Sequence, residues 1–167
     1  LRAQPAAGPN RVLELDGANS FVALPPNIFN SLKQATVEGW MNWGRVRSSD
    51  RFFDFGDRDA EIYIRADRTQ LNALVAGRDG TRHRIEVAGI VRTNEWCHIA
   101  LVTGPGGAKL YFNGTLVGTN AHEGSFAGLV GRNNYLGKSN YRSSDSSTRG
   151  TMDEVRIWDH ARTPEQI

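Results

Sequence analysis

Three aromatic residues lie beside hydrogen-bonding side chains of the kind that bind sugars. Trp43, Tyr63 and Tyr141 are at or near predicted loops and have arginine, aspartate and asparagine neighbours. An aromatic face packs against a sugar ring, and Arg, Asp and Asn make directed hydrogen bonds to its polar groups. The sequence therefore predicts a ligand-binding set of Trp43, Arg45, Arg51, Asp54, Tyr63, Arg65, Asn140 and Tyr141. The expected rim of this site consists of the polar segments 45–51, 57–59 and 139–149.

An alternative interpretation makes the same aromatic residues part of the core. Val37 and Met41 lie six and two positions before Trp43, so the three side chains share one face of an extended strand. Large aromatic residues mostly supply buried area, and Tyr63 would then pack between the sheets. The other tryptophans are predicted to be packing residues: Trp40, Trp96 and Trp158.

The Asp153 carboxylate is predicted to lie on an apolar face, where it needs a hydrogen-bonding, cationic or metal partner. In the predicted strand Thr151–Trp158, the alternation of side chains puts it on the same face as Val155 and Ile157. A buried, ionised Asp must be hydrogen-bonded, paired or bound to a metal, because leaving it bare would cost several kcal/mol. One solution is a structural network in which backbone N–H groups of the turn 16–19, or an arginine, donate to the carboxylate.

The sequence lacks the signatures of a zinc site and of a nucleophilic serine. The histidines fit neither the spacing of zinc ligands nor that of a metalloprotease helix, and no Gly-x-Ser-x-Gly elbow is present for a nucleophilic serine. The single cysteine, Cys97, lies inside an apolar run, where a buried and inert thiol is expected. The sequence therefore indicates no zinc, serine or cysteine chemistry.

Charge and hydropathy exclude two further classes of function. The formal net charge is +2, and between Arg45 and Arg92 ten arginines are interleaved with eight acidic residues. Such interleaving builds no single-sign field, so a nucleic-acid partner is not expected. No apolar run approaches the roughly 18 residues of a transmembrane helix, so no membrane span is predicted.

The elements that must position these residues are short strands. The chain alternates apolar runs with Gly, Asn, Asp and Pro at intervals of roughly 8–12 residues, as expected of an antiparallel sandwich. The predicted strands are Val12–Leu15, Ser20–Leu24, Thr36–Trp43, Arg51–Phe55, Glu61–Arg65, Leu71–Ala76, His83–Val87, Glu95–Thr103, Lys109–Phe112, Leu116–Thr119, Tyr135–Gly137 and Thr151–Trp158.

Turn and helix signals are few and specific. Asn113-Gly114 predicts a tight hairpin because both residues tolerate positive φ, and Pro105-Gly106-Gly107 predicts a second reversal. A short helical turn is expected near 27–33. A helix is expected to start near the C-terminus, with Thr163 as its N-cap and a proline at its first position.

The chain is predicted to hold one domain. Its 167 residues fit a single core, since domains average roughly 100–200 residues. Residues 1–10 are rich in Pro, Gly and Ala without periodicity and are predicted to be a leader or linker, and 11–167 form the domain. The chain begins without Met and stops within a predicted helix, so we expect it to be part of a larger protein with covalently linked neighbouring domains.

Five segments carry a resemblance to a known family. In chain order they are Leu13–Val22 (LELDGANSFV), Ala35–Trp43 (ATVEGWMNW), Arg51–Gly56 (RFFDFG), Glu95–Val102 (EWCHIALV) with Lys109–Gly118 (KLYFNGTLVG), and Tyr135–Asn140 (YLGKSN) with Gly150–Ile167 (GTMDEVRIWDHARTPEQI). The series resembles the laminin-G-like, concanavalin A-like jelly-roll domains. That family usually has Trp-His-His where this chain has Trp96-Cys97-His98.

The resemblance implies a jelly roll of two stacked antiparallel sheets. It also implies binding to glycans, proteins or calcium, or service as a spacer or sensory ectodomain. Calcium near the first turn and the last strand is the second possible partner of Asp153. Asp16, Asn19 and Asp153 would supply hard oxygen ligands, with backbone carbonyls and water completing a shell of six to eight oxygens. Similar sequences often have Asp where this chain has Asn19, which lowers the ligand charge.

Folds of this kind also include glycoside hydrolases. Those enzymes place two or three carboxylates at alternating positions of one strand, and retaining hydrolysis needs two carboxyl groups about 5–5.5 Å apart. Here Asp153 and Glu154 are adjacent, so as strand residues they point to opposite faces, and Asp59 and Glu61 lead into a run with no further acid before Asp67. A catalytic role is therefore not expected.

These observations lead to one functional hypothesis and its rivals. The domain is expected to be a non-catalytic module that recognises a carbohydrate or a protein surface and is appended to a larger, extracytoplasmic bacterial protein. The alternative is a structural spacer or the sensory ectodomain of a signalling receptor. A glycoside hydrolase is the least favoured interpretation.

Overall fold

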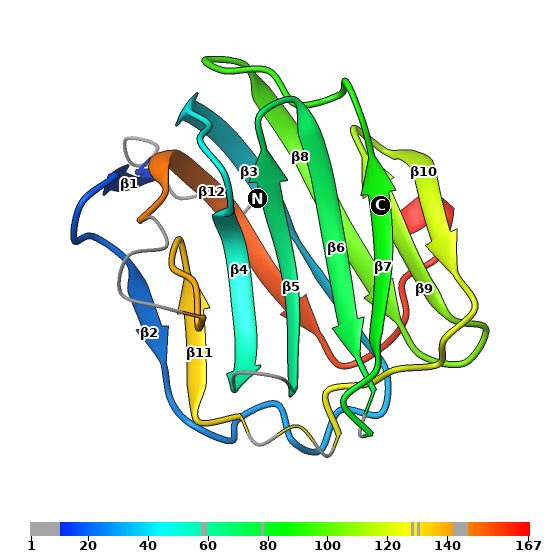
Figure 1. Cartoon of the computed structure of the whole chain (residues 1–167). Helices are drawn as coiled ribbons and strands as arrows, with labels where there is room; N and C mark the ends of the chain where they lie inside the picture. The colour runs from blue at the N-terminus through cyan, green and yellow to red at the C-terminus, as the bar shows by residue number, and fades with distance from the viewer. Residues whose placement is uncertain (1–10, 58–59, 78, 128, 130, 142–146) are drawn as a thin grey trace, which may run out of the picture.

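The fold is an all-β sandwich of two antiparallel sheets (Figure 1). This computed structural model describes residues 11–57, 60–77, 79–127, 129, 131–141 and 147–167. The predicted leader, 1–10, lies outside the described residues, as do parts of the predicted rim, 58–59 and 142–146. No helix in the described ranges has the length and apolarity needed to cross a membrane.

Within the described ranges each sheet has six strands. In sheet A the strands run in the order β1 (Leu13–Asp16), β12 (Arg149–Trp158), β3 (Ala35–Arg45), β8 (Trp96–Thr103), β9 (Ala108–Phe112) and β10 (Thr115–Asn120). In sheet B the order is β2 (Val22–Leu24), β11 (Asn133–Leu136), β4 (Asp50–Asp57), β5 (Ala60–Asp67), β6 (Gln70–Ala76) and β7 (Arg82–Val87). The predicted strands and the two-sheet architecture are confirmed, with boundaries that differ by a few residues.

The two predicted reversals are also confirmed. Asn113 and Gly114 have φ of 50° and 76° and join β9 to β10. The helical turn predicted near 27–33 needs correction. Residues 26–31 form consecutive turns closed by bonds such as Asn30 N–H to the Asn27 carbonyl at 3.2 Å, and not a helix. The predicted helix start near the C-terminus is confirmed, with Thr163 as its N-cap, and it takes the form of a single 3₁₀ turn, Pro164–Gln166.

The core lies between the sheets and is built by strand alternation. Val37, Met41 and Trp43 from β3 are fully buried and meet Phe53 and Phe55 from β4. Their exclusion from water is the main force that holds the two sheets together, because apolar burial contributes roughly 25 cal/mol per Å².

Cys97 is buried in this core, as predicted. Its thiol donates to the Met41 carbonyl at 3.3 Å, and burial raises its pKa to about 12. The protonated thiol is a poor nucleophile, so no reactive role follows from its place in the fold.

A bulge in β12 overturns the predicted environment of Asp153. Glu154 has φ of 51°, and the register with β3 shifts between Asp153 and Arg156. As a result Val155 and Ile157 pack against the core, whereas Asp153 is half-buried on the outer face, opposite the exposed Trp40. Simple alternation assumed a regular strand, and the extra residue moved the carboxylate to the other face.

Candidate functional site

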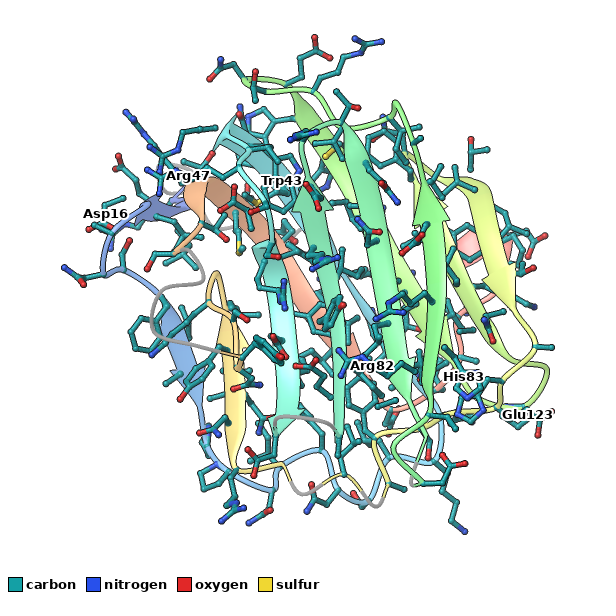
Figure 2. All side chains as sticks on the ribbon, viewed as in Figure 1. Asp16, Trp43, Arg47, Arg82, His83 and Glu123 are labelled. Carbon is teal, nitrogen blue, oxygen red and sulfur yellow. The ribbon has the colours of Figure 1, made fainter. Side chains whose placement is uncertain are left out.

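The outer face of sheet B carries a pocket of about 480 Å³. Alternate residues of β5 and β7 point away from the core and line it, and Figure 2 labels Arg82 among them. The neighbouring loops close the pocket from the sides. The lining residues are Ser49, Arg51, Glu61, Tyr63, Arg65, Arg82, Arg84 and Tyr141. We call this the arginine pocket.

A small apolar cluster lies beneath the arginine pocket. Tyr63 and Leu74 are paired across β5 and β6, and with Ala76 they form a small buried cluster separate from the main core. The Arg51 guanidinium stacks over the Tyr63 ring at 4.2 Å from the ring centroid. The buried cluster therefore supports the Arg51 side chain from below.

Buried hydrogen bonds hold Arg51 and Arg65 in place. Arg51 Nε donates to Asp54 Oδ2 at 2.9 Å, and Nη1 donates to the Ser49 carbonyl at 3.0 Å. Arg65 Nη1 donates to Ser49 Oγ at 2.9 Å. In turn Asn140 donates to both carboxylate oxygens of Asp54, from its backbone N at 3.0 Å and its Nδ2 at 3.1 Å. The pocket is thus preorganised, since its side chains are already ordered before a ligand arrives.

The pocket carries excess positive charge. The described lining residues include four arginines and one carboxylate, Glu61, which accepts a bond from Arg82 Nη2 at 2.7 Å. The burial of Glu61, and then the nearby Asp54 carboxylate, raise its pKa to about 7. Glu61 Oε2 and Arg65 Nε are buried and have no hydrogen-bond partner among the described residues. Such atoms carry a desolvation cost that a polar ligand could relieve.

The fold brings together most of the predicted ligand-binding set. Arg51, Tyr63, Arg65 and Tyr141 line the pocket, and Asp54 and Asn140 form the layer that supports Arg51. Tyr63 lies on the outer face of sheet B, so the expectation that it packs between the sheets is wrong.

Two members of the predicted set lie elsewhere. Trp43 is fully buried between the sheets, so the core interpretation holds for it. Arg45 ends β3 in sheet A, opposite Arg149, and does not line the pocket. Sequence reasoning missed Glu61, Arg82 and Arg84. The signal that could have found them is the period of two, with polar residues at 61 and 65 and at 82 and 84.

The predicted calcium ligands do not converge. Asp16 Oδ1 already accepts four hydrogen bonds, from the N–H groups of Ala18, Asn19 and Ser20 and from the Ser20 hydroxyl. These bonds hold the pKa of Asp16 well below its usual range. The register pairs Asp16 with Arg149, and Asp153 is four residues further along β12, about 13 Å at 3.3 Å per residue.

The turn that begins at Asp16 is thus held by the hydrogen bonds that the Asp16 carboxylate accepts from residues 18–20, and Asp153 takes no part in them. Asp153 Oδ1 accepts instead from the Glu154 N–H at 2.8 Å. Among the described residues no group of three or more His, Cys, Asp or Glu could hold a metal ion. Figure 2 shows Asp16 at one edge of the sandwich, well away from Arg82 in the arginine pocket. Calcium binding stays a prediction.

Comparison with known families now decides where the chain belongs. A family model described as the concanavalin A-like lectin/glucanases superfamily matches residues 16–167. The chain belongs to this superfamily. A comparison with curated protein sequences found no match.

Several solved structures share this concanavalin A-like fold. The CBM40 domain of the Ruminococcus gnavus IT-sialidase has a TM-score of 0.69 at 14% identity, covering 92% of this chain and 95% of that one. The same domain has been solved with α2,3-sialyllactose bound. Domain 4 of AbnA, a GH43 extracellular arabinanase from Geobacillus stearothermophilus, was solved with arabinotriose. It has a TM-score of 0.66 at 21% identity, covering 94% of this chain and 79% of that one.

Proposed function

We propose that this concanavalin A-like domain is a non-catalytic carbohydrate-binding module, and that its ligand is a saccharide with a carboxylate or sulfate group held in the arginine pocket. The observation that carries the proposal is the convergence of Arg51, Arg65, Arg82 and Arg84 in one pocket. A guanidinium fork matches a carboxylate or sulfate with two parallel hydrogen bonds. Tyr141, an exposed aromatic residue in the pocket lining, would pack against the apolar face of the sugar ring.

Among the described residues Glu61 is the one carboxylate that lines the pocket, which supports a binding role. Glycoside hydrolysis by the usual mechanisms requires two carboxyl groups that flank the scissile bond. Glu61 lines the pocket, whereas the nearby Asp54 is fully buried behind Arg51 and bonded to it and to Asn140. Asp54 therefore cannot approach a sugar without the loss of that network.

The similar structures support carbohydrate binding and a modular context. The sialidase domain and the arabinanase domain are each named as parts of larger carbohydrate-active enzymes, and each was solved with a saccharide bound. By analogy, this domain is one module of a larger, extracytoplasmic bacterial protein and directs its neighbours to an acidic glycan.

A glycan array with matched titrations tests the proposal. The chain is screened against sialylated, uronic-acid-containing and sulfated glycans together with their uncharged counterparts. The affinity for the best acidic glycan is then measured by calorimetry for Arg65→Ala and Arg84→Ala. Each variant is expected to bind at least tenfold more weakly, because one charge-assisted contact to a desolvated anion is worth about 1.5–3 kcal/mol.

Arg132→Ala is the matched control, because Arg132 is an exposed arginine bound to Asp57 outside the pocket. It is expected to bind as the wild type does. No binding to any acidic glycan, or equal binding by all three variants, would contradict the proposal. The first outcome would favour the spacer or sensory alternative.

A further inference from the structure

The outer face of sheet A exposes two tryptophans that were predicted to be packing residues. Trp40 in β3 is 42% exposed and Trp96 in β8 is 43% exposed. The register pairs Trp40 with His98 and Asn42 with Trp96, so the two indoles are diagonal neighbours on one face. The His98 ring meets Trp40 edge to face at 5.4 Å between ring centroids.

These tryptophans lie in a second pocket, of about 580 Å³. Its remaining walls come from His98, the hairpin at Asn113-Gly114, the arginines of β12 and the C-terminal segment, and the C-terminal turn. The lining residues are Glu38, Trp40, Trp96, His98, Asn113, Gly114, Arg156, Arg162, Gln166 and Ile167. We call this the tryptophan pocket.

Unlike the arginine pocket, the tryptophan pocket is neutral. Arg156 is ion-paired with Glu154, and Arg162 is ion-paired with Glu38. Burial lowers the pKa of His98, so its ring is uncharged at neutral pH. With each cation already neutralised by the chain itself, the pocket favours an uncharged ligand.

The exposed apolar area is too small for a stable protein interface. An indole side chain buries up to roughly 250 Å², so two tryptophans exposed by about two fifths offer on the order of 200 Å². A specific protein interface buries about 800 Å² per partner, of which on the order of 450 Å² is apolar. The adjacent part of the same face is already covered, because Ala161 and Ile167 pack over Ala100, Val102 and Tyr111.

We propose that the tryptophan pocket is a second binding site, for a neutral saccharide chain whose sugar rings stack on Trp40 and Trp96. Asn113, Gln166 and the two arginines surround the indoles with planar hydrogen-bonding groups, which are suited to sugar hydroxyls. The site lies on the outer face of the opposite sheet from the arginine pocket, so one module holds an acidic and a neutral glycan at once. This inference goes beyond the proposed function and does not depend on it.

Electrophoresis in gels that contain a soluble polysaccharide tests the second site. The probes are arabinoxylan, arabinan, mixed-linkage β-glucan and galactomannan, all of which are uncharged. At least one is expected to retard the wild-type chain, and Trp40→Ala and Trp96→Ala are each expected to weaken that binding at least tenfold. Ile28→Ala, which removes an exposed apolar side chain outside the pocket, is expected to migrate as the wild type does.

Three further measurements make the outcome decisive. Arg84→Ala is expected to retain neutral-polysaccharide binding. Thermal melts of both tryptophan variants are expected to stay cooperative with a midpoint lowered by only a few degrees, because each indole is partly exposed. Retardation by none of the four polysaccharides overturns the second site, as does a loss of binding in Arg84→Ala. A wild-type dimer in light scattering that becomes a monomer in Trp96→Ala would also overturn it, by identifying the face as a contact between copies.

Discussion

Of the described residues that line the arginine pocket, Glu61 is the one that opposes an anionic ligand, and its charge depends on pH. Its pKa is raised to about 7 because its burial, and then the Asp54 carboxylate, disfavour the ionised form. As pH falls from 8 to 6, Glu61 gains a proton and its repulsion of the ligand is lost. The affinity for an acidic glycan is therefore expected to rise about fivefold, or about 1 kcal/mol.

Calorimetric titrations at pH 8, 7 and 6 check this prediction. In Glu61→Gln the affinity is expected to stay constant over that range and to equal the wild-type value at pH 6, since glutamine retains a hydrogen-bond acceptor for Arg82. A variant with the same pH dependence as the wild type would show that another group controls binding.

Trp40 and Trp43 lie in the same strand, β3, but only Trp43 is buried. The period of two correctly grouped Trp43 with Val37 and Met41, and the structure buries all three. The same period places Trp40 on the opposite face with Glu38, whereas the general tendency of tryptophan to be buried favours a packing role for it. Residue type predicts the burial of Trp40 less well than the period of two does, because the partner sheet decides which face of a strand meets the core.

Two consecutive glycines between β8 and β9 have similar backbones and unequal surroundings. Gly106 and Gly107 have φ of 86° and 91°. A Cβ on Gly106 would meet nothing within 4 Å, whereas one on Gly107 would lie 2.2 Å from the Asn120 carbonyl oxygen. Gly106→Ala is expected to cost about 1 kcal/mol for the left-handed conformation, and Gly107→Ala about 2–4 kcal/mol because overpacking is added.

Urea unfolding of the two variants checks this difference. Equal losses of stability would mean that the backbone conformation alone determines the cost. The tight turn at 105–107 follows from local chemistry, but the approach of β10 to Gly107 is tertiary, since β9 and β10 pair up to Asn120 beside it.

Strand β12 can be predicted from the sequence, but the bulge within it cannot. Its existence follows from its alternation and β-branched residues, but the bulge at Glu154 does not, because its positive φ is imposed by pairing with β3. One extra residue exchanges the two faces of a strand. The predicted burial of Asp153 was lost for that reason.

A histidine pair joins the two sheets at one edge of the molecule. His83 in β7 stacks on His122, which follows β10, with 3.6 Å between ring centroids; Figure 2 labels His83 at that edge. Desolvation, and then the charge of His83, lower the pKa of His122. The folded protein therefore binds fewer protons at this site than the unfolded chain does. This contribution to stability is present above pH 6.5, the ordinary histidine value, and is lost as pH falls below it.

His122→Phe isolates this effect because phenylalanine retains the stacking and does not titrate. Thermal melts from pH 7.5 to 5.5 are expected to show a smaller fall in midpoint for the variant than for the wild type. Glu61 acts in the opposite direction over part of this range, because its raised pKa favours the folded state as pH falls, and it contributes equally to both proteins. Parallel curves would exclude the histidine pair as a source of pH dependence.

Arginines and acidic residues alternate along the chain, whereas in the folded molecule several of the arginines gather in one pocket. Along the chain, arginines and acids between Arg45 and Arg92 are interleaved and predict no local field. In the fold Arg51, Arg65, Arg82 and Arg84 meet in one pocket, whereas Asp57 and Asp67 end their strands and Asp79 lies between β6 and β7. The net charge of +2 therefore conceals a basic site.

The sequence by itself determined the all-β class, the strands and their tight turns, and it singled out half of the residues that line the arginine pocket. These follow from local physics, since alternation and turn chemistry act over a few residues. Tertiary structure decided which face of each strand meets solvent, that Trp43 is buried while Trp40 and Trp96 are exposed, and that Asp153 lies away from Asp16. Those outcomes depend on pairing between strands far apart in the chain, which no local pattern encodes.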